Sequence, residues 1–323
     1  MKTTYIKWFI IICIIIVSCK KTKNTDPSEI PEPPQQNEEG IDGDPDIGDL
    51  SIPGTFFDKF EGSLDDSKWE KLNQVWGQPD NPLYQHGGVI KENVYTQSGS
   101  AVMRALGDRY SGPLRGAGGQ SKRLGGVIKS KQRFASGKYE IKMRVLQAPD
   151  MGVLSAAWTF WYKEITSATN PVAYQKALTA GNIASNGKIT LNHEIDIEVK
   201  GQNLANPIFT NWIGEKTGEY DSQPFKLNKG LNDGAYHIYR WDWHTGGNGE
   251  TARVEYYIDN QLIRTSTIKV PYIASYIYIG NWFAWWAGND TGTYKAPDFD
   301  TKEMYVDWIK FTPFNEPNDD FLE

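Results

Sequence analysis

The chain has 323 residues, of which 39% are hydrophobic and 13% aromatic, and its formal net charge is −6. This length accommodates one large domain or two small ones. An acidic chain lacks the basic surface that binding to nucleic acid requires, so nucleic acid is excluded as a partner. The 12 Trp and 17 Tyr residues can fill a core, or they can stack on the apolar faces of sugar rings.

Residues 1–18 are predicted to be an export signal. Lys2 and Lys7 form a positively charged start, and the apolar run that follows over residues 8–17 is too short for a comfortable membrane span. The run ends in IVSC, which looks like a bacterial lipobox with cleavage before Cys19 and a lipid on its thiol. The alternative is an ordinary signal peptide with an incidental cysteine. The lipobox predicts an exported protein of the cell envelope that touches a membrane only through this anchor.

Residues 19–50 are predicted to be a disordered tether, because Pro, Asn, Gln and acidic residues dominate them. The composition changes at residue 51, where short alternating segments begin. We expect a catalytic domain over residues 51–315 followed by a tail over 316–323. The two cysteines, Cys13 and Cys19, both precede this domain. The domain is therefore stable through packing alone, or with a metal.

Short alternating segments with turn residues between them recur through the domain. Predicted strands include residues 137–145, 252–258, 261–265, 275–280 and 304–311. Asp259-Asn260 separates two of them and predicts a hairpin. Residues 162–190 break the pattern and predict a long loop with a short helix at 171–179, which either walls a cleft or decorates the surface. The scarcity of helical periodicity predicts an all-β sandwich.

An unusual row of acids occurs at residues 192–200, which read NHEIDIEVK. Alternate residues of a strand face the same side, so Glu194, Asp196 and Glu198 share one face while the residues between them pack on the other. The Cα atoms of Glu194 and Glu198 lie roughly 13 Å apart at ~3.3 Å rise per residue. Retaining glycosidases need carboxyl groups about 5–5.5 Å apart and inverting ones about 6.5–9.5 Å apart, and the spacing alone leaves both open.

Three interpretations fit this bare pattern. Two of the acids can act as nucleophile and general acid while the middle aspartate tunes their pKa values. Alternating acids on a strand can instead ligate a hard cation such as calcium. The third interpretation is a solvated strand face whose acids pair with lysines on neighbouring strands.

The segment HEIDIEVKG resembles the signature of glycoside hydrolase family 16, the retaining endo-glucanases and endo-galactanases with a β-jelly-roll fold. In the E-x-D-x-E version of that signature, which lacks a bulge, the first Glu is the nucleophile, the Asp assists it and the last Glu is the acid/base. The resemblance implies these roles for Glu194, Asp196 and Glu198. It extends over residues 55–313 and favours the lichenases and xyloglucan-active enzymes, because many laminarinases and agarases carry an extra residue before the last Glu.

The same resemblance implies further site residues. The expected substrate-binding residues are Glu140, Trp158, Phe160, Asn211, Trp282 and Trp286. Asp307, in a segment that resembles the closing strand of lichenases, implies a structural Ca²⁺, with a buried hydrogen bond as the alternative. We expect Trp161, Trp243 and Trp308 to pack in the core, and His193 to be a core or supporting residue and not a base.

These inferences predict a β-jelly-roll sandwich of two antiparallel sheets with a concave cleft. The expected activity is that of a monomeric, retaining endo-β-glucanase that needs no cofactor for catalysis and acts on a polysaccharide. Mixed-linkage β-1,3-1,4-glucan is the expected substrate, and xyloglucan, β-1,3-glucan and a galactan are the alternatives. Two other hypotheses are a non-catalytic glycan-binding lipoprotein on the same fold and a transglycosylase.

Overall fold

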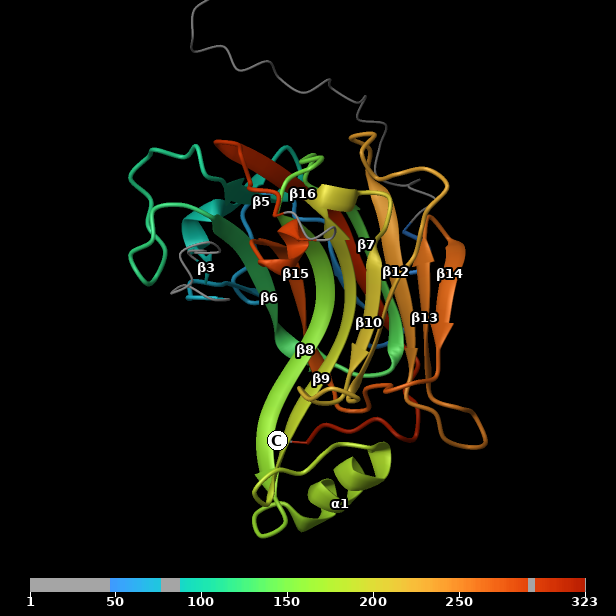
Figure 1. Ribbon diagram of the computed structural model, residues 1–323. Helices are drawn as coiled ribbons and strands as arrows, with labels where there is room; N and C mark the ends of the chain where they lie inside the picture. Colours follow the sequence, from blue (N-terminus) through green and yellow to red (C-terminus); the bar gives the residue numbers. More distant parts are fainter. Residues whose placement is uncertain (1–46, 77–87, 290–293, 323) are drawn as a thin grey trace, which may run out of the picture. The chain divides into compact units, whose positions relative to one another are not determined.

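The computed structural model describes residues 47–76, 88–289 and 294–322. By its internal contacts the chain divides into Met1–Asp46 and Ile47–Glu323. The predicted signal peptide, Cys19 and most of the predicted tether lie outside the described residues. The second unit is almost entirely β-structure, as the sequence predicted (Figure 1). In the described part of the chain, no helix combines the length and the apolar character needed to cross a membrane.

One layer of the domain, here named the cleft sheet, is antiparallel and has the strand order β11-β10-β9-β8-β15-β6, with β2 beside β6. Its strands are β2 (Trp69–Lys71), β6 (Leu124–Phe134), β8 (Leu154–Thr166), β9 (Lys188–Lys200), β10 (Ile208–Trp212), β11 (Tyr220–Pro224) and β15 (Ser275–Trp282). The two central strands, β8 and β9, are long and strongly curved (Figure 1). Their curvature makes one face of the cleft sheet concave, namely the face that points away from the core.

The second layer, the outer sheet, has the order β5-β16-β7-β12-β13-β14, with β4 beside β5 and β1 beside β16. Its strands are β1 (Phe56–Asp58), β4 (Val94–Gln97), β5 (Ser100–Leu106), β7 (Gly137–Arg144), β12 (His237–His244), β13 (Arg253–Ile258), β14 (Gln261–Ser266) and β16 (Thr301–Pro313). Leu106 pairs with Leu124 of β6 and joins the two layers, and the short β3 (Gly88–Val89) runs parallel to β6. The described residues also include the single-turn 3₁₀ helices η2 (Lys91–Asn93), η3 (Gly201–Asn203) and η4 (Trp286–Gly288).

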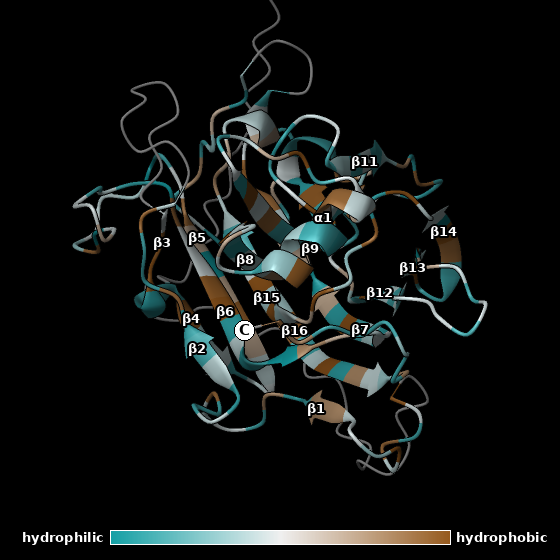
Figure 2. Ribbon diagram, turned by 90° about the horizontal axis from the view of Figure 1, so that it is seen from below, coloured by the Kyte–Doolittle hydropathy of each residue, from teal (hydrophilic) through white to brown (hydrophobic). Residues whose placement is uncertain are grey.

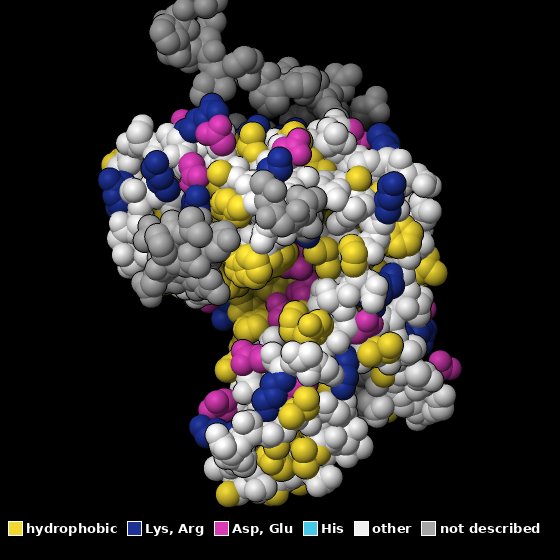
Figure 3. All heavy atoms as spheres, viewed as in Figure 1, with side chains coloured by type: hydrophobic (Ala, Val, Ile, Leu, Met, Phe, Trp, Pro, Cys, Tyr) yellow, Lys and Arg dark blue, Asp and Glu magenta, His cyan; other side chains and the backbone are white. Residues whose placement is uncertain are grey.

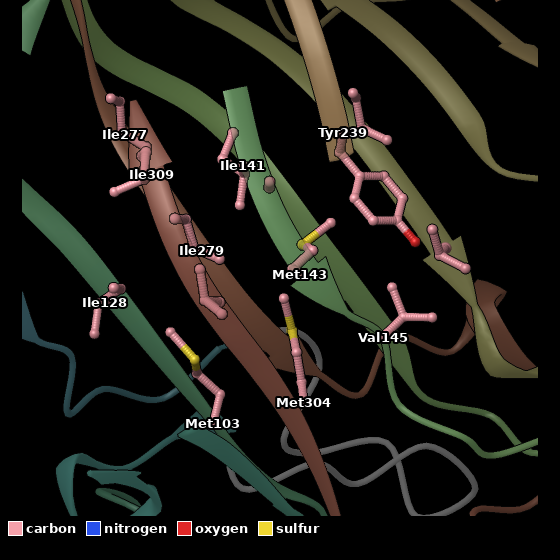
Figure 4. Close-up of a cluster of buried hydrophobic side chains, with 14 of the residues drawn as sticks. Met103, Ile128, Ile141, Met143, Val145, Tyr239, Ile277, Ile279, Met304 and Ile309 are labelled. Atoms are coloured by element: carbon pink, nitrogen blue, oxygen red, sulfur yellow. The ribbon is translucent and has the colours of Figure 1, made fainter. Parts of the chain in front are cut away.

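The strands form because their apolar residues recur at every second position. In β7, for example, Tyr139, Ile141 and Met143 are buried, while the residues between them are half-buried. Bands of hydrophobic and hydrophilic residues therefore alternate along the strands (Figure 2). The apolar faces of the two sheets meet in one large core, part of which is shown in Figure 4. Trp243 and Trp308 are buried as predicted.

The predicted hairpin at Asp259-Asn260 is confirmed, since β13 and β14 pair directly across these two residues. Both have positive φ angles, 49° and 60°. A two-residue turn of this hand matches the right-handed twist of the strands, and Asp and Asn tolerate it better than most residues.

The predicted loop over residues 162–190 is largely wrong. The strands β8 and β9 continue into it and pair without a register shift from Leu154 opposite Lys200 to Thr166 opposite Lys188. The predicted helix is present as α1 (Pro171–Ala180), which begins with proline and ends at Gly181 with a φ of 92°. The alternation of apolar residues in this segment is interrupted, so the sequence did not indicate how far the hairpin extends. Trp161 packs inside this extension, as expected for a core residue.

Ile197 is completely buried between two of the acids on β9. We expect Ile197→Ala to lower the free energy of unfolding by about 2–5 kcal/mol, because it leaves a cavity in a close-packed core, and Ile197→Val by about 0.5–1.5 kcal/mol. Urea unfolding measures both. Val172→Ala is the control. Because the Val172 side chain is 83% exposed on α1, this substitution should leave the free energy of unfolding nearly unchanged. An Ile197→Ala protein as stable as the wild type would contradict this account of the core.

Candidate active site

The three acids of β9 lie on the concave face of the cleft sheet. On one side, Glu194, Asp196 and Glu198 are paired in register with Phe160, Trp158 and Ala156 of β8. On the other side the same acids are paired with Trp212, Thr210 and Ile208 of β10. The residues between the acids, Ile195 and Ile197, are fully buried in the core. The alternation predicted from the sequence is therefore confirmed, and the register through this segment carries no bulge.

The acids open into a cavity of about 310 Å³. Its lining residues come from β8, β9 and β15 and from the segment after β2: Gln74, Trp76, Ala156, Trp158, Phe160, Glu194, Asp196, Glu198, Tyr278 and Trp282. Figure 3 shows a hollow in the surface where hydrophobic side chains lie against acidic ones. Carboxyl groups on an apolar floor are poorly solvated, which is the condition under which their protonation states can be tuned.

Hydrogen bonds join the acids into a short chain. The side-chain amide of Asn192 donates to Glu194 Oε2 at 3.0 Å, and the indole N–H of Trp212 donates to Asp196 Oδ2 at 3.0 Å. The Asp196 and Glu194 carboxyl groups are hydrogen-bonded to each other. Two like charges in contact are avoided when one of them holds a proton. Asp196 is the buried member of this pair and is the one that donates.

The pKa values of all three acids are raised, and burial is the largest cause in each case. Burial and the negative charge of Glu194 raise the pKa of Glu198 to about 8, against an opposing effect from Lys200. Burial raises the pKa of Glu194 to about 7, and the hydrogen bonds of Glu194 with Asn192 and Asp196 oppose this rise. Burial and both neighbouring glutamates raise the pKa of Asp196 well above its usual range. Near neutral pH, Glu194 is thus more readily ionised than Glu198.

Aromatic rings form one wall of the cavity. Trp158 stacks on Tyr278 with ring centroids 5.2 Å apart, and Trp76 stacks on Trp282 at 5.3 Å. Trp286 of η4 meets Trp282 edge-on at 6.1 Å. The side chain of Trp158 is only 4% exposed, so it is part of the floor. Trp282 and Trp286 are half-buried. Trp282 lines the cavity, and Trp286 contacts Trp282 without lining the cavity itself.

The sequence analysis missed three aromatic residues of the site, Trp76, Tyr278 and Trp212. Tyr278 could have been found, because it alternates with buried isoleucines on the same strand as Trp282. Trp212 lies next to the predicted Asn211, and only the pairing of β10 with β9 decides which of the two faces the acids. Trp76 lies outside the regular strands and carried no periodic signal.

Two predicted substrate-binding residues are not in the cleft, so these predictions are wrong. Asn211 pairs with Ile195 and faces the core, where its amide donates to Ser266 Oγ and to the carbonyl of Ile268, both at 3.1 Å. Glu140 lies on β7 of the outer sheet, between the core residues Tyr139 and Ile141. Its side chain therefore points away from the core on the opposite side of the sandwich. The two-residue alternation shows that each side chain faces away from its neighbours in the chain. It does not show which of the two faces borders the cleft.

Asp307 lies on β16 of the outer sheet, and its carboxylate is 3.3 Å from Lys142 Nζ. Calcium takes six to eight oxygen ligands, which can be carboxylates, backbone or amide carbonyls and waters. Within residues 47–76, 88–289 and 294–322, no group of three or more His, Cys, Asp or Glu side chains is arranged to hold a metal ion. Asp307 thus forms an ion pair with Lys142, and a calcium held by this single carboxylate with backbone carbonyls stays a prediction.

His193 is buried in the core side of β9, as expected for a residue that is not a base. Its Nδ1 accepts hydrogen bonds from the backbone N–H groups of Tyr272 and Ile273, at 3.2 and 3.4 Å. Burial lowers the pKa of His193 to about 3, so the ring is neutral at physiological pH. It links β9 to the segment before β15 and helps hold the strand in place.

Comparison with known proteins agrees with this geometry. The chain is 23% identical over 260 residues to a beta-glucanase of Bacillus subtilis, which covers 80% of this chain and 86% of that protein. Among solved structures, a Bacillus licheniformis beta-glucanase aligns with a TM-score of 0.56 and 21% identity, covering 80% of this chain and 98% of that one. The catalytic domain of an endo-1,3-beta-glucanase (laminarinase) from Thermotoga petrophila aligns with a TM-score of 0.54 and 17% identity, covering 80% and 97%.

At these identities the structural alignments support the fold, which is the jelly roll of the beta-glucanases. The family follows from a separate comparison of the sequence with family profiles. Residues 91–310, which contain all three acids and most of both sheets, match the profile of "Glycosyl hydrolases family 16". The chain belongs to glycosyl hydrolases family 16.

Proposed function

We propose that the protein is a retaining endo-β-glucanase that hydrolyses mixed-linkage β-1,3-1,4-glucan, with β-1,3-glucan, xyloglucan and a galactan as alternative substrates. The observation that carries this proposal is the row of Glu194, Asp196 and Glu198 on one strand face, on the floor of an aromatic-lined cavity. Two carboxyl groups with separate protonation states are what glycoside hydrolysis requires. The rings of Trp76 and Trp282 supply apolar surface on which sugar rings can stack.

The proposed reaction is a double displacement. The Glu194 carboxylate attacks the anomeric carbon while Glu198 gives its proton to the departing glycosidic oxygen, and a glycosyl-enzyme forms. Glu198, now a carboxylate, takes a proton from water, which attacks the same carbon and releases Glu194. Asp196 donates a hydrogen bond to Glu194 and orients it. Asn192 supports the charged form of Glu194 from the other side.

The proposal extends to the location of the enzyme. A lipid on Cys19 would anchor it to the cell envelope, and residues 20–50 would act as the tether between the lipid and the domain. This arrangement suits a monomeric enzyme that meets a polysaccharide outside the cytoplasm. The anchor rests on the lipobox-like sequence IVSC alone.

Glu194→Gln is expected to reduce glucan hydrolysis by more than about a thousandfold, because the amide cannot form the glycosyl-enzyme. Sugar release from barley β-glucan, laminarin, xyloglucan and agarose measures the activity and ranks the substrates. Glu164→Gln is the matched control, since Glu164 is exposed and pairs with Lys188 away from the cavity. Full activity of Glu194→Gln would rule out the proposed mechanism. Tight glycan binding with no release from any polymer, by wild type, would favour a binding protein instead.

The anomer first released distinguishes the two stereochemical outcomes. If Glu194 and Glu198 work at the short, retaining separation, proton NMR of the first products should show the β-anomer, before mutarotation mixes the two. Products that appear first as the α-anomer would indicate an inverting enzyme. Longer oligosaccharides formed in the presence of acceptor sugars would indicate transglycosylation.

Asn192→Ala is expected to move the acidic limb of the kcat/KM–pH profile to higher pH by about one unit. The variant loses a hydrogen bond to a charged group, worth about 1.5–3 kcal/mol, which now holds down the pKa of Glu194. A raised pKa means that Glu194 becomes a carboxylate only at higher pH, so kcat/KM reaches its plateau at a higher pH than in the wild type. The measurement is kcat/KM against pH on barley β-glucan. An unmoved acidic limb would show that Asn192 does not support the charged nucleophile.

A further inference from the structure

A lysine continues the row of acids on β9. Lys200 is the last residue of the strand, two positions after Glu198, and it pairs with Leu154 of β8. Leu154 belongs to the apolar cluster under the cleft, together with Ala156 and Trp158, so Lys200 faces the cleft as the acids do. Alternation therefore produces the row Glu194, Asp196, Glu198, Lys200.

The Lys200 side chain is 8% exposed, which is unusual for lysine. Its Nζ lies 5.9 Å from the ring centre of Trp286, whose edge meets Trp282 at the border of the cavity. An ammonium group removed from water is costly unless it faces compensating groups. The Trp286 ring offers one such contact, and the carboxyl row offers the opposite charge. Lys200 thus connects the aromatic rim to the end of the row that carries Glu198.

Within the part of the chain that the structure describes, the groups around Glu198 are few and chemically distinct. From β9 these are Glu194, Asp196 and Lys200, and the last opposes the effect of the first on the Glu198 pKa. From β8 and β10 the paired residues are Ala156 and Ile208, which do not titrate. From β15 comes Tyr278, whose hydroxyl stays protonated because burial raises its pKa.

Another basic residue of the cleft sheet also lies near the aromatic wall of the cavity. Lys129 of β6 is paired with Tyr278 in register and is 3.5 Å from the Glu70 carboxylate. Its charge is therefore balanced by its own acidic partner. Among the described residues, Lys200 is the basic side chain whose charge opposes the rise of the Glu198 pKa.

We propose that Lys200 is a positioning residue that acts on the reaction through Glu198, because its buried ammonium group lies two positions along the same strand face and stabilises the ionised form of the acid/base carboxyl. This inference rests on the function proposed above. Glu198 becomes a carboxylate each time it gives its proton to the leaving oxygen, beside an acid row that disfavours a further negative charge. The ammonium group of Lys200 stabilises that carboxylate until water returns the proton. An acid is most effective when it can both hold and release its proton near the working pH.

The test compares Lys200→Met, which keeps the apolar stem and removes the charge, with Lys200→Arg, which keeps the charge. Removing the positive charge makes the Glu198 carboxylate less stable, so Glu198 keeps its proton to higher pH. The alkaline limb of kcat/KM should therefore move up by about one pH unit in Lys200→Met and stay near the wild-type position in Lys200→Arg. An alkaline limb that stays in place in Lys200→Met, whether or not KM rises, would overturn the proposal, and a raised KM would assign Lys200 to substrate binding.

A second measurement does not depend on activity. The ¹³C resonance of the Glu198 carboxyl, assigned by its loss in Glu198→Gln, can be titrated in wild type and in Lys200→Met. The midpoint should rise by about one pH unit in Lys200→Met, and equal midpoints would overturn the proposal. If the wild type hydrolyses none of the polymers, the proposed function fails, while this titration still decides whether Lys200 acts on Glu198. If Lys200→Met does not fold, Lys200→Gln gives the same comparison.

Discussion

The structure depends on the strict two-residue alternation of β9. Because this strand pairs with both β8 and β10 without a register shift, every second side chain enters the core and the others line the cleft. A slip of one residue would exchange the two sets. It would bury Glu194, Asp196 and Glu198 in the core and expose Ile195 and Ile197. The apolar half of the strand thus holds the acidic half in place, and stability and site geometry rest on the same pairing.

The electrostatics of the site follow from where this strand lies. The acids stand on an apolar floor and beside stacked tryptophan and tyrosine rings, so burial is the main cause of their raised pKa values. The neighbours then separate the three groups. Glu194 receives hydrogen bonds, Asp196 keeps a proton, and Glu198 faces both the charge of Glu194 and that of Lys200. Repulsion between like charges, which would destabilise an ordinary strand, here gives each acid a different affinity for its proton.

Sequence reasoning succeeded where the evidence was local. The strands, the Asp259-Asn260 hairpin, α1 and the shared face of the three acids all follow from periodicities and turn residues within about ten positions. It failed where two strands had to be placed relative to each other. Asn211 and Glu140 were assigned to the cleft, yet one faces the core and the other lies on the far side of the outer sheet. The extension of the β8–β9 hairpin was missed for a related reason, because its interrupted alternation is completed by packing against α1.

By itself, the sequence determined the family, the class of fold and the row of acids, because each depends on the order of residues along one segment. Only the tertiary structure decided which aromatic rings meet these acids, that Trp212 and not its neighbour reaches Asp196, and that Asp307 faces Lys142. These relations join strands that are far apart in the chain. Their register and the sheet to which they belong are set by the packing of the whole core, which local alternation does not specify.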